Sequence, residues 1–232
     1  MSYDPAQWKY PTLAKPASDG MYCYHIQRRI SVWFSTRLAD HITPNAATGI
    51  DLFLGISAAV LVLLDYWLWA AVLVQAFGIF SCVDGEIARI QDRASRIGDF
   101  LDTMTDRGVE LVLLLAIAIS LGTRVNAESA LAAALALLGG VFLLTASSEK
   151  FRSTYQMGYP KRRLEKLFSL FCGGADSRLL LLSIALVVSD ITGDERFLLW
   201  LVLILAALCY LNFIVRIGLV YKHFGTDKPT GS

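Results

Sequence analysis

The stretch Ser81–Arg107, SCVDGEIARIQDRASRIGDFLDTMTDR, contains five aspartates in a chain that is otherwise strongly apolar, and three of them stand out by their positions. Asp84 lies in its first half, and Asp102 and Asp106 lie in its second half, four residues apart. Four residues make about one helical turn, so the last two side chains share one helix face. Ionisable groups in membrane spans are costly and usually face a cavity or a partner. The stretch therefore predicts a polar site between two helices of a membrane protein.

The composition of the whole chain indicates an all-α membrane protein. Of its 232 residues, 55% are hydrophobic and 18% are charged, whereas a soluble domain carries about a quarter charged residues. The mean hydropathy is positive, at +0.52. Only helices satisfy the backbone polar groups of such apolar segments inside lipid. We therefore expect a polytopic helical protein.

The apolar residues lie in blocks close to the roughly 20 residues that a helix needs to cross a bilayer. We expect six transmembrane helices, with a tight turn at Asp65 and Tyr66 between the first two. The predicted spans are 46–64, 66–88, 99–122, 129–149, 177–192 and 197–220. The chain then divides into an N-terminal segment (1–45), a six-helix catalytic domain (46–221) and a short tail (222–232).

The positive charges predict how these helices are oriented in the membrane. Lysine and arginine are concentrated in the N-terminal segment and in alternate connections, and such segments stay on the cytoplasmic side. We expect both termini and the acidic stretch on the cytoplasmic side of the inner cell membrane. The basic residues concerned are Lys15, Arg28, Arg29, Arg37, Arg89, Arg93, Arg96, Lys150, Arg152, Lys161, Arg162, Arg163 and Lys166.

The segment Tyr24–Ile42, YHIQRRISVWFSTRLADHI, alternates apolar and basic residues at near-helical spacing. It predicts an amphipathic juxtamembrane helix on the cytoplasmic leaflet. An ordinary solvated helix packed on the loops is the alternative. The first 40 residues contain no apolar core long enough for a cleavable signal peptide, so we expect none.

Three carboxylates that converge in a partly dry site cannot all stay ionised unless a cation neutralises them. Mg²⁺ prefers oxygen ligands and typically works through a few carboxylates plus the phosphates of a substrate. Asp84, Asp102 and Asp106 are therefore candidate ligands for Mg²⁺ or Mn²⁺. Gly85 lets a ligand approach the backbone closely, and Arg89 can pair with a phosphate or with an acid.

Two alternative roles for the acids stay open at this point. The acids could cap helices and pair with Arg89, Arg96 or Arg107; Asp99 is well placed as a cap. They could instead line an ion or proton pathway. A divalent-cation transporter is disfavoured, because the acids cluster near one membrane face rather than at the middle of the bilayer.

The stretch resembles the signature of the CDP-alcohol phosphotransferases, the membrane enzymes of phospholipid synthesis. Their pattern is D-x2-D-G-x2-A-R-x8-G-x3-D-x3-D, and seven of its eight fixed positions are present here with every spacing kept. ITPNAAT before the first span is similar to the family's T-P-N-x-x-T. KPASDG is similar to the branch that contains di-inositol-phosphate-phosphate synthases. The matching signature residues are Asp84, Gly85, Ala88, Arg89, Gly98, Asp102 and Asp106.

This resemblance implies an enzyme that moves a substituted phosphate from a CDP-linked alcohol to a hydroxyl acceptor and releases CMP. The donor would be CDP-diacylglycerol or a CDP-polyol, and the enzyme would act as a homodimer in the lipid bilayer, with no nucleic acid partner. Asp84 and Asp102 would bind Mg²⁺ or Mn²⁺. Asp106 would be the general base for the acceptor hydroxyl and a further metal ligand. The nucleotide would lie against Asp84, Gly85, Ala88, Arg89 and Gly98.

Ser81 departs from the pattern, because the family has at this position an aspartate that contributes to the metal cluster. A serine hydroxyl is a neutral and weaker ligand, although water can link it to a cation. Three consequences stay open: altered metal occupancy, a catalytically silent protein that binds CDP-alcohols or partners, or a serine introduced to trap a complex. Because every other signature residue is present, we expect a transferase with Ser81 as a weak metal ligand.

Basic residues after the fourth predicted span are candidates for the acceptor site. Lys150 and Arg152 could bind a phosphate on an acceptor such as inositol phosphate. They could equally anchor the cytoplasmic side of the membrane. Arg216 and Asn212 in the sixth span are further candidates.

Overall fold

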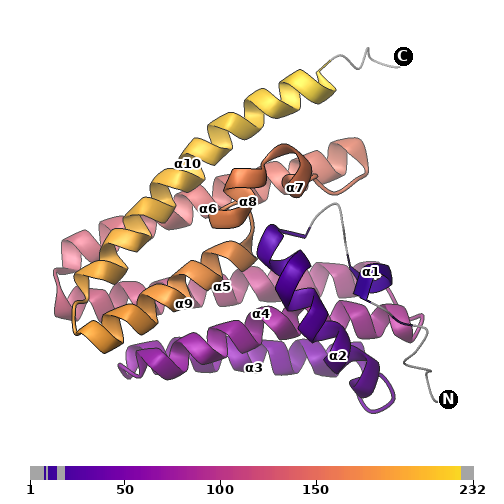
Figure 1. The fold of residues 1–232 in the computed structure, drawn as a ribbon, viewed down its shortest axis with the longest axis horizontal. Coiled ribbons are helices and arrows are strands. Elements are labelled where there is room, and N and C mark those ends of the chain that lie inside the picture. Colours follow the sequence, from indigo (N-terminus) through magenta and orange to yellow (C-terminus); the bar gives the residue numbers. More distant parts are fainter. Residues whose placement is uncertain (1–7, 9, 15–18, 226–232) are drawn as a thin grey trace.

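The computed structural model describes residues 8, 10–14 and 19–225, and in this part of the chain every secondary-structure element is a helix and there is no strand. Figure 1 shows long helices packed side by side, with short helices at one end. The predicted KPASDG segment falls partly outside the described residues, and so does most of the predicted tail. The short helices are α1 (Tyr10–Leu13), η2 (Cys23–Gln27), α2 (Arg28–Leu38), α7 (Lys161–Leu164) and α8 (Lys166–Phe171).

The described residues form long helices at all six predicted positions. They are α3 (Pro44–Leu63), α4 (Trp67–Ile90), α5 (Arg96–Arg124), α6 (Ala127–Tyr155), α9 (Ala175–Thr192) and α10 (Arg196–Phe224). Among the described residues, α3, α4, α6 and α10 are long and apolar enough to cross a membrane. The other two carry more charge for their length: α5 contains the acids Asp99, Asp102 and Asp106, and α9 contains Asp176, Arg178 and Asp190. That α5 and α9 also cross the membrane stays a prediction.

Side-chain caps explain where several of these helices begin. Thr43 accepts a hydrogen bond from the backbone N–H of Ala46, directly before Pro44 at the first position of α3. Ser95 caps α5 by accepting from the Gly98 N–H at 3.1 Å. The suggestion that Asp99 caps this helix is therefore wrong, because Ser95 already occupies the cap position. A turn at Asp65, where the backbone has a positive φ of 63°, joins α3 to α4 as expected.

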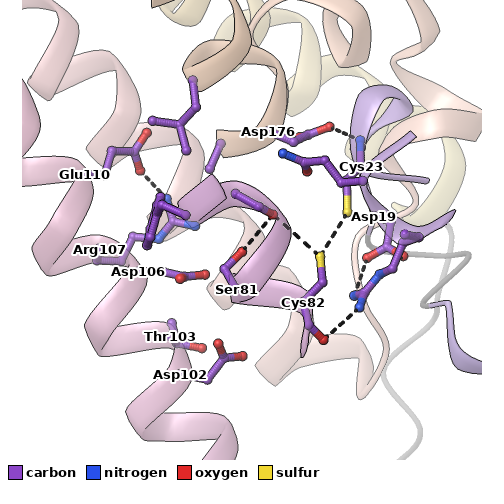
Figure 2. Close-up of a pocket in the computed structure, with 18 of the residues that line it drawn as sticks. Asp19, Cys23, Ser81, Cys82, Asp102, Thr103, Asp106, Arg107, Glu110 and Asp176 are labelled. Carbon is purple, nitrogen blue, oxygen red and sulfur yellow. Dashed lines mark hydrogen bonds and ion pairs between the residues drawn. The ribbon is translucent and has the colours of Figure 1, made fainter. Parts of the chain in front are cut away.

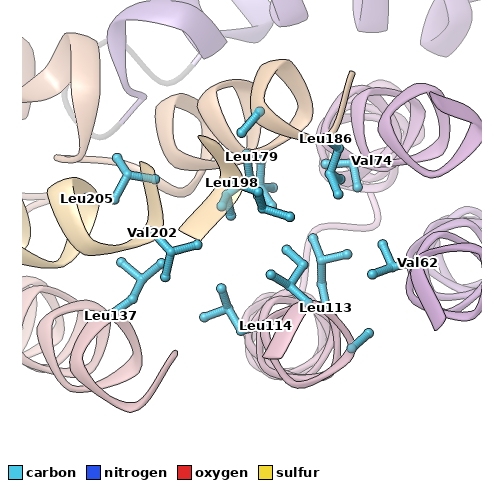
Figure 3. Packing of buried hydrophobic residues seen from close by; sticks show 14 of the residues in the cluster. Val62, Val74, Leu113, Leu114, Leu137, Leu179, Leu186, Leu198, Val202 and Leu205 are labelled. Atoms are coloured by element: carbon cyan, nitrogen blue, oxygen red, sulfur yellow. The ribbon is translucent and has the colours of Figure 1, made fainter. Parts of the chain in front are cut away.

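The core lies both between consecutive helices and between helices that are distant in sequence. α3 packs against α4 and α5, α4 packs against α9, and α6 packs against α5 and α10. Glycines allow close approach at two of these contacts: Gly55 of α3 lies against Val109 of α5, and Gly140 of α6 lies against Cys209 of α10. Figure 3 shows leucines and valines from α4, α5, α6, α9 and α10 filling the space between them. This packing holds the acidic ends of α4 and α5 beside α3.

The helix α2 lies at the position predicted for the N-terminal amphipathic helix and packs on α4. Its inward face is mixed, because Arg28, Ser31 and Ser35 are buried beside Val32. Its exposed face carries the apolar side chains of Ile30 and Trp33 and the charged side chains of Arg29 and Arg37. An exposed face that combines apolar and basic side chains suits the boundary between lipid and water, so its place on a membrane surface stays our prediction.

Candidate active site

The three predicted acids lie where α4 ends and α5 begins. The chain reverses between Ile90 and Arg96, which brings Asp84 of α4 to the same end of the molecule as Asp102 and Asp106 of α5. The helix α3 forms the third side, since the Thr48 hydroxyl donates a hydrogen bond to Asp84 Oδ2 at 2.8 Å. The site is thus built from three helices rather than from the two that contain the signature.

One cavity, of about 210 Å³, holds every residue that the resemblance assigns to the nucleotide. Its walls include Asp84, Gly85, Ala88, Arg89 and Gly98. A Cβ added at Gly85 would meet only the Arg89 guanidinium, at 3.5 Å. Internal packing does not require a glycine at this position, so the space beside the Gly85 backbone is available to a ligand. We call this space the nucleotide cavity.

A second cavity, of about 240 Å³, contains the other two predicted site residues, Ser81 and Asp106. Figure 2 shows Ser81 of α4 facing the α5 side chains of Asp102 and Asp106. Asp102 also lines the nucleotide cavity. We call this second space the acceptor cavity, after the role that we propose for it below. The Asp102 carboxylate lies in the wall that the two cavities share.

Ser81 does not replace the missing carboxylate in the geometry observed. Its hydroxyl donates to the backbone carbonyl of Gly78 in its own helix at 3.3 Å. The Asp106 Oδ1 atom is buried and has no hydrogen-bond partner. Among the described residues, no three His, Cys, Asp or Glu side chains are close enough together to form a ready metal site. An oxygen-binding cation nevertheless fits the chemistry of these donors, because a buried carboxylate oxygen without a partner is costly.

A fourth carboxylate, Asp51 of α3, belongs to the same acidic cluster and was missed by the sequence analysis. Its side chain is 2% exposed, and its Oδ1 atom has no hydrogen-bond partner. Asp106, Asp84 and Asp102 are the acids that act on it electrostatically, in that order. The sequence did contain a signal for Asp51, because this acid lies inside the first predicted span. An ionisable residue within a transmembrane helix usually faces a functional site or a partner.

The N-terminal segment closes one side of the acceptor cavity. Arg28 pairs with Asp19 at 3.0 Å and with Glu86 at 2.9 Å. The Ser31 and Ser35 hydroxyls donate to the same Glu86 carboxylate, at 2.7 and 2.6 Å. Because Glu86 lies two residues after Asp84, this buried network ties α2 directly to the part of α4 that carries the site.

The acceptor cavity is also lined by Lys161 and Asp176. Asp176 accepts a hydrogen bond from the backbone N–H of Cys23 at 2.8 Å. Burial lowers the pKa of the Lys161 ammonium to about 8, and the nearby Arg216 charge acts in the same direction. From the sequence, Lys161 was named only among the basic residues that predict the membrane orientation. It lies more than fifty residues after the signature, so no local spacing connects it with the acids.

Other arginines near this cavity already form ion pairs with carboxylates of the protein. Arg178 pairs with Glu110 at 2.6 Å, and Arg107 binds the same carboxylate from the other side. Arg216, a candidate for the acceptor site, is buried and binds Glu165 at 2.8 Å. These arginines therefore bind acidic side chains of the protein itself.

The remaining candidates from the sequence line neither of these two cavities. Lys150 lines a separate cavity between α6 and α10. Arg152 forms an exposed ion pair with Asp99 at 2.6 Å, and Asn212 is buried within α10. The structure does not bring Lys150 or Asn212 to the acidic cluster. Arg152, through Asp99, contacts the wall of the nucleotide cavity, and it lines a third cavity, of about 290 Å³, together with Lys161.

Known proteins resemble this chain in sequence and in fold. Residues 41–208 match the model of the CDP-alcohol phosphatidyltransferase family. The bifunctional IPC transferase and DIPP synthase of Thermococcus kodakarensis is 36% identical over 144 residues, which are 62% of this chain and 32% of that protein. The corresponding protein of Aquifex aeolicus is 28% identical over 92% of this chain and 47% of its own length. The chain thus spans about a third to a half of these relatives.

Two further proteins match over nearly their whole length. The phosphatidylinositol phosphate synthase of Cutibacterium acnes is 30% identical over 80% of this chain and 86% of its own. The crystal structure of phosphatidylinositol phosphate synthase from Mycobacterium tuberculosis, solved with CDP-DAG bound, has a TM-score of 0.71. It is 18% identical, and the match covers 88% of this chain and all of that one. By its sequence match over most of its length, this chain belongs to the CDP-alcohol phosphatidyltransferase family.

Proposed function

We propose that this protein transfers a substituted phosphate from a CDP-linked alcohol to a hydroxyl acceptor and releases CMP. The observation that carries the proposal is the position of Asp102 between two cavities. The residues assigned to the nucleotide line one cavity, and the proposed base Asp106 lines the other. A reaction between a nucleotide-linked phosphate and a separately bound alcohol needs this kind of arrangement.

The transfer step uses the residues of the shared wall. The CDP group lies in the nucleotide cavity against Gly85, Ala88 and Gly98, with Arg89 beside its phosphates. The acceptor oxygen forms a bond to the phosphorus that carries the alcohol, and the bond from this phosphorus to the bridging oxygen breaks. CMP leaves with the electron pair of that bond, and Asp106 takes the proton of the acceptor hydroxyl.

A divalent cation, Mg²⁺ or Mn²⁺, fits this site. The carboxylates of Asp84, Asp102 and Asp106 would hold it, with Ser81 reaching it only through water. When bound, it would neutralise the diphosphate and the charge that develops on CMP. The partnerless Oδ1 of Asp106 and the open space at Gly85 support this assignment.

The acceptor in this proposal carries a phosphate, for which Lys161 is the most suitable cation. Lys161 lines the acceptor cavity, whereas Arg178 and Arg216 are already bound to carboxylates. An inositol phosphate suits this cavity and agrees with the names of the relatives. The donor is CDP-diacylglycerol or a CDP-polyol. We assign Lys150 and Arg152 to anchoring of the membrane face.

We propose the same membrane arrangement as the charge pattern predicts. The protein crosses the inner membrane six times, with both termini and the two cavities on the cytoplasmic side, and acts as a homodimer. Attachment of cysteine-reactive probes from either side of sealed vesicles would test the orientation, and light scattering in detergent would test the oligomeric state.

The decisive experiment measures CMP release by the purified protein in detergent. The assay combines Mg²⁺ or Mn²⁺ with CDP-diacylglycerol or CDP-inositol as donor and inositol phosphate, inositol or glycerol phosphate as acceptor. CMP release that requires one donor and one acceptor supports the proposal and identifies both substrates. CDP binding without CMP release under all conditions would instead support a catalytically silent binding protein.

A further inference from the structure

We propose that Asp51 supplies the carboxylate that Ser81 lacks, so that the divalent-cation site has four acids drawn from three helices. The inference rests on the proposed function, since it assigns a residue to the cation of that site. It concerns a residue of α3, which lies outside the signature. It also explains how the site retains its negative charge despite the serine.

The contact between α3 and α4 places Asp51 level with Ser81. The two helices are joined by a short turn and run antiparallel. The hydrogen bond from Thr48 to Asp84 fixes their register. Asp51 is three residues after Thr48, and Ser81 is three residues before Asp84. Moving nearly one turn along both helices from this hydrogen bond therefore brings Asp51 opposite Ser81.

The contact between α3 and α5 places Asp51 level with Asp106 as well. These helices run in the same direction, because the chain reverses twice between them. Gly55 lies directly against the Val109 side chain. Asp51 is one turn before Gly55, and Asp106 is nearly one turn before Val109. The two registers agree on a position for Asp51 between Ser81 and Asp106.

The surroundings of Asp51 call for a cation. The side chain is 2% exposed and one carboxylate oxygen has no hydrogen-bond partner. Its interacting acids are those of the signature, with Asp106 first. A buried carboxylate surrounded by other carboxylates is strongly unfavourable in its ionised form unless a positive charge is present. A cation bound among these acids would supply that charge, with Asp51 as a ligand or as the acceptor of a hydrogen bond from a metal-bound water.

Mn²⁺ binding to the purified full chain tests the inference, with MnCl2 alone as the probe and free Mn²⁺ measured by electron paramagnetic resonance. Four proteins are compared: the parent, Asp51→Asn, Ser81→Asp, and the double variant. We expect Asp51→Asn to weaken Mn²⁺ binding about tenfold or more. We expect the double variant to recover affinity to within about threefold of the parent. Asp190→Asn, which alters an exposed acid of α9, is the matched control and should bind like the parent.

Two results would overturn the inference. One is unchanged Mn²⁺ affinity in Asp51→Asn; the other is a double variant that stays as weak as Asp51→Asn although both elute as folded protein. Measuring CMP release by the parent protein distinguishes failure of this inference from failure of the proposed function. If Mn²⁺ binding depends on Asp51 but no CMP is released, only the proposed function fails. If CMP is released and Asp51→Asn binds Mn²⁺ normally, only the inference fails.

Discussion

Two buried polar regions of this molecule differ in how their charges are balanced. Between α6, α8 and α10, Glu165 accepts hydrogen bonds from Arg216 and from the Tyr159 hydroxyl at 2.7–2.8 Å. Arg216 also donates to the carbonyl of Leu144 and to two serines of α6. Between α3, α4 and α5, by contrast, Asp51 and Asp106 each have a buried oxygen with no partner.

The difference separates a structural site from a binding site. A buried ion pair whose hydrogen bonds are satisfied needs no ligand, and its function is to hold helices in place. Clustered carboxylates with free oxygens store unfavourable free energy, which a bound cation and its substrate phosphates would relieve. Changes in the first region should therefore affect stability, and changes in the second should affect ligand binding and turnover.

The largest expected effect is on turnover. Asp106→Asn should lower the rate of CMP release by about 10²- to 10⁴-fold, because the amide cannot accept the acceptor's proton. CDP binding measured by calorimetry should remain. Asp190→Asn should keep the parent rate. Normal turnover in Asp106→Asn would remove this residue from the role of base.

The next effect is on stability. Arg216→Met leaves Glu165 buried without its partner and should cost about 3–5 kcal/mol of unfolding free energy. The thermal midpoint in detergent should fall by more than about 6 °C. Adding Glu165→Gln to Arg216→Met should recover most of the loss. If Arg216→Met leaves the thermal midpoint unchanged, the ion pair between Arg216 and Glu165 does not stabilise the fold.

Gly85→Ala should affect the nucleotide without affecting the fold. The added methyl group meets only the Arg89 guanidinium at 3.5 Å, so the thermal midpoint should stay unchanged. It would project into the nucleotide cavity, and CDP affinity should fall about tenfold. Gly49→Ala, where an added Cβ meets nothing within 4 Å, is the matched control. Equal CDP affinity in the two variants would place the nucleotide elsewhere.

A pH dependence is expected from Lys161. Its pKa is lowered to about 8 by burial, so the ammonium is present below pH 8 and is lost above it. The KM for a phosphorylated acceptor should therefore rise up to about tenfold between pH 7 and pH 9. Lys161→Arg should abolish this rise, since arginine stays charged, and Lys161→Met should give a high KM at both pH values. A parent KM that does not change with pH would exclude contact between Lys161 and the phosphate.

The smallest expected effect is on the stability of the protein in the absence of divalent cations. Under this condition, Asp51→Asn should unfold at the same temperature as the parent or up to a few degrees higher, because it removes a buried repulsion. Addition of Mn²⁺ should then stabilise the parent more than the variant. A variant that is markedly less stable without cations would assign Asp51 to the structural region instead.

Local rules account for what could be predicted from the sequence. The helices appear at the six predicted positions because apolar blocks and capping residues such as Thr43 and Ser95 act over a few residues. The nucleotide residues lie along one cavity because their spacing within two adjacent helices sets which face they share. The cap at Asp99 was wrong because two polar residues compete for one helix start, and Ser95 lies at the correct distance.

From the sequence alone, the chain could be predicted to be a helical protein of membrane composition, with a signature of three acids, two glycines, an alanine and an arginine around a helix reversal. The packing of the helices, by contrast, placed Asp51 close to those acids and placed Lys161, but not Lys150, in the wall of the acceptor cavity. It also decided that Arg178 and Arg216 are neutralised by Glu110 and Glu165. These outcomes depend on contacts between helices that are tens of residues apart in the sequence. The register in which such helices pack sets which side chains meet, and local spacing in the sequence does not determine that register.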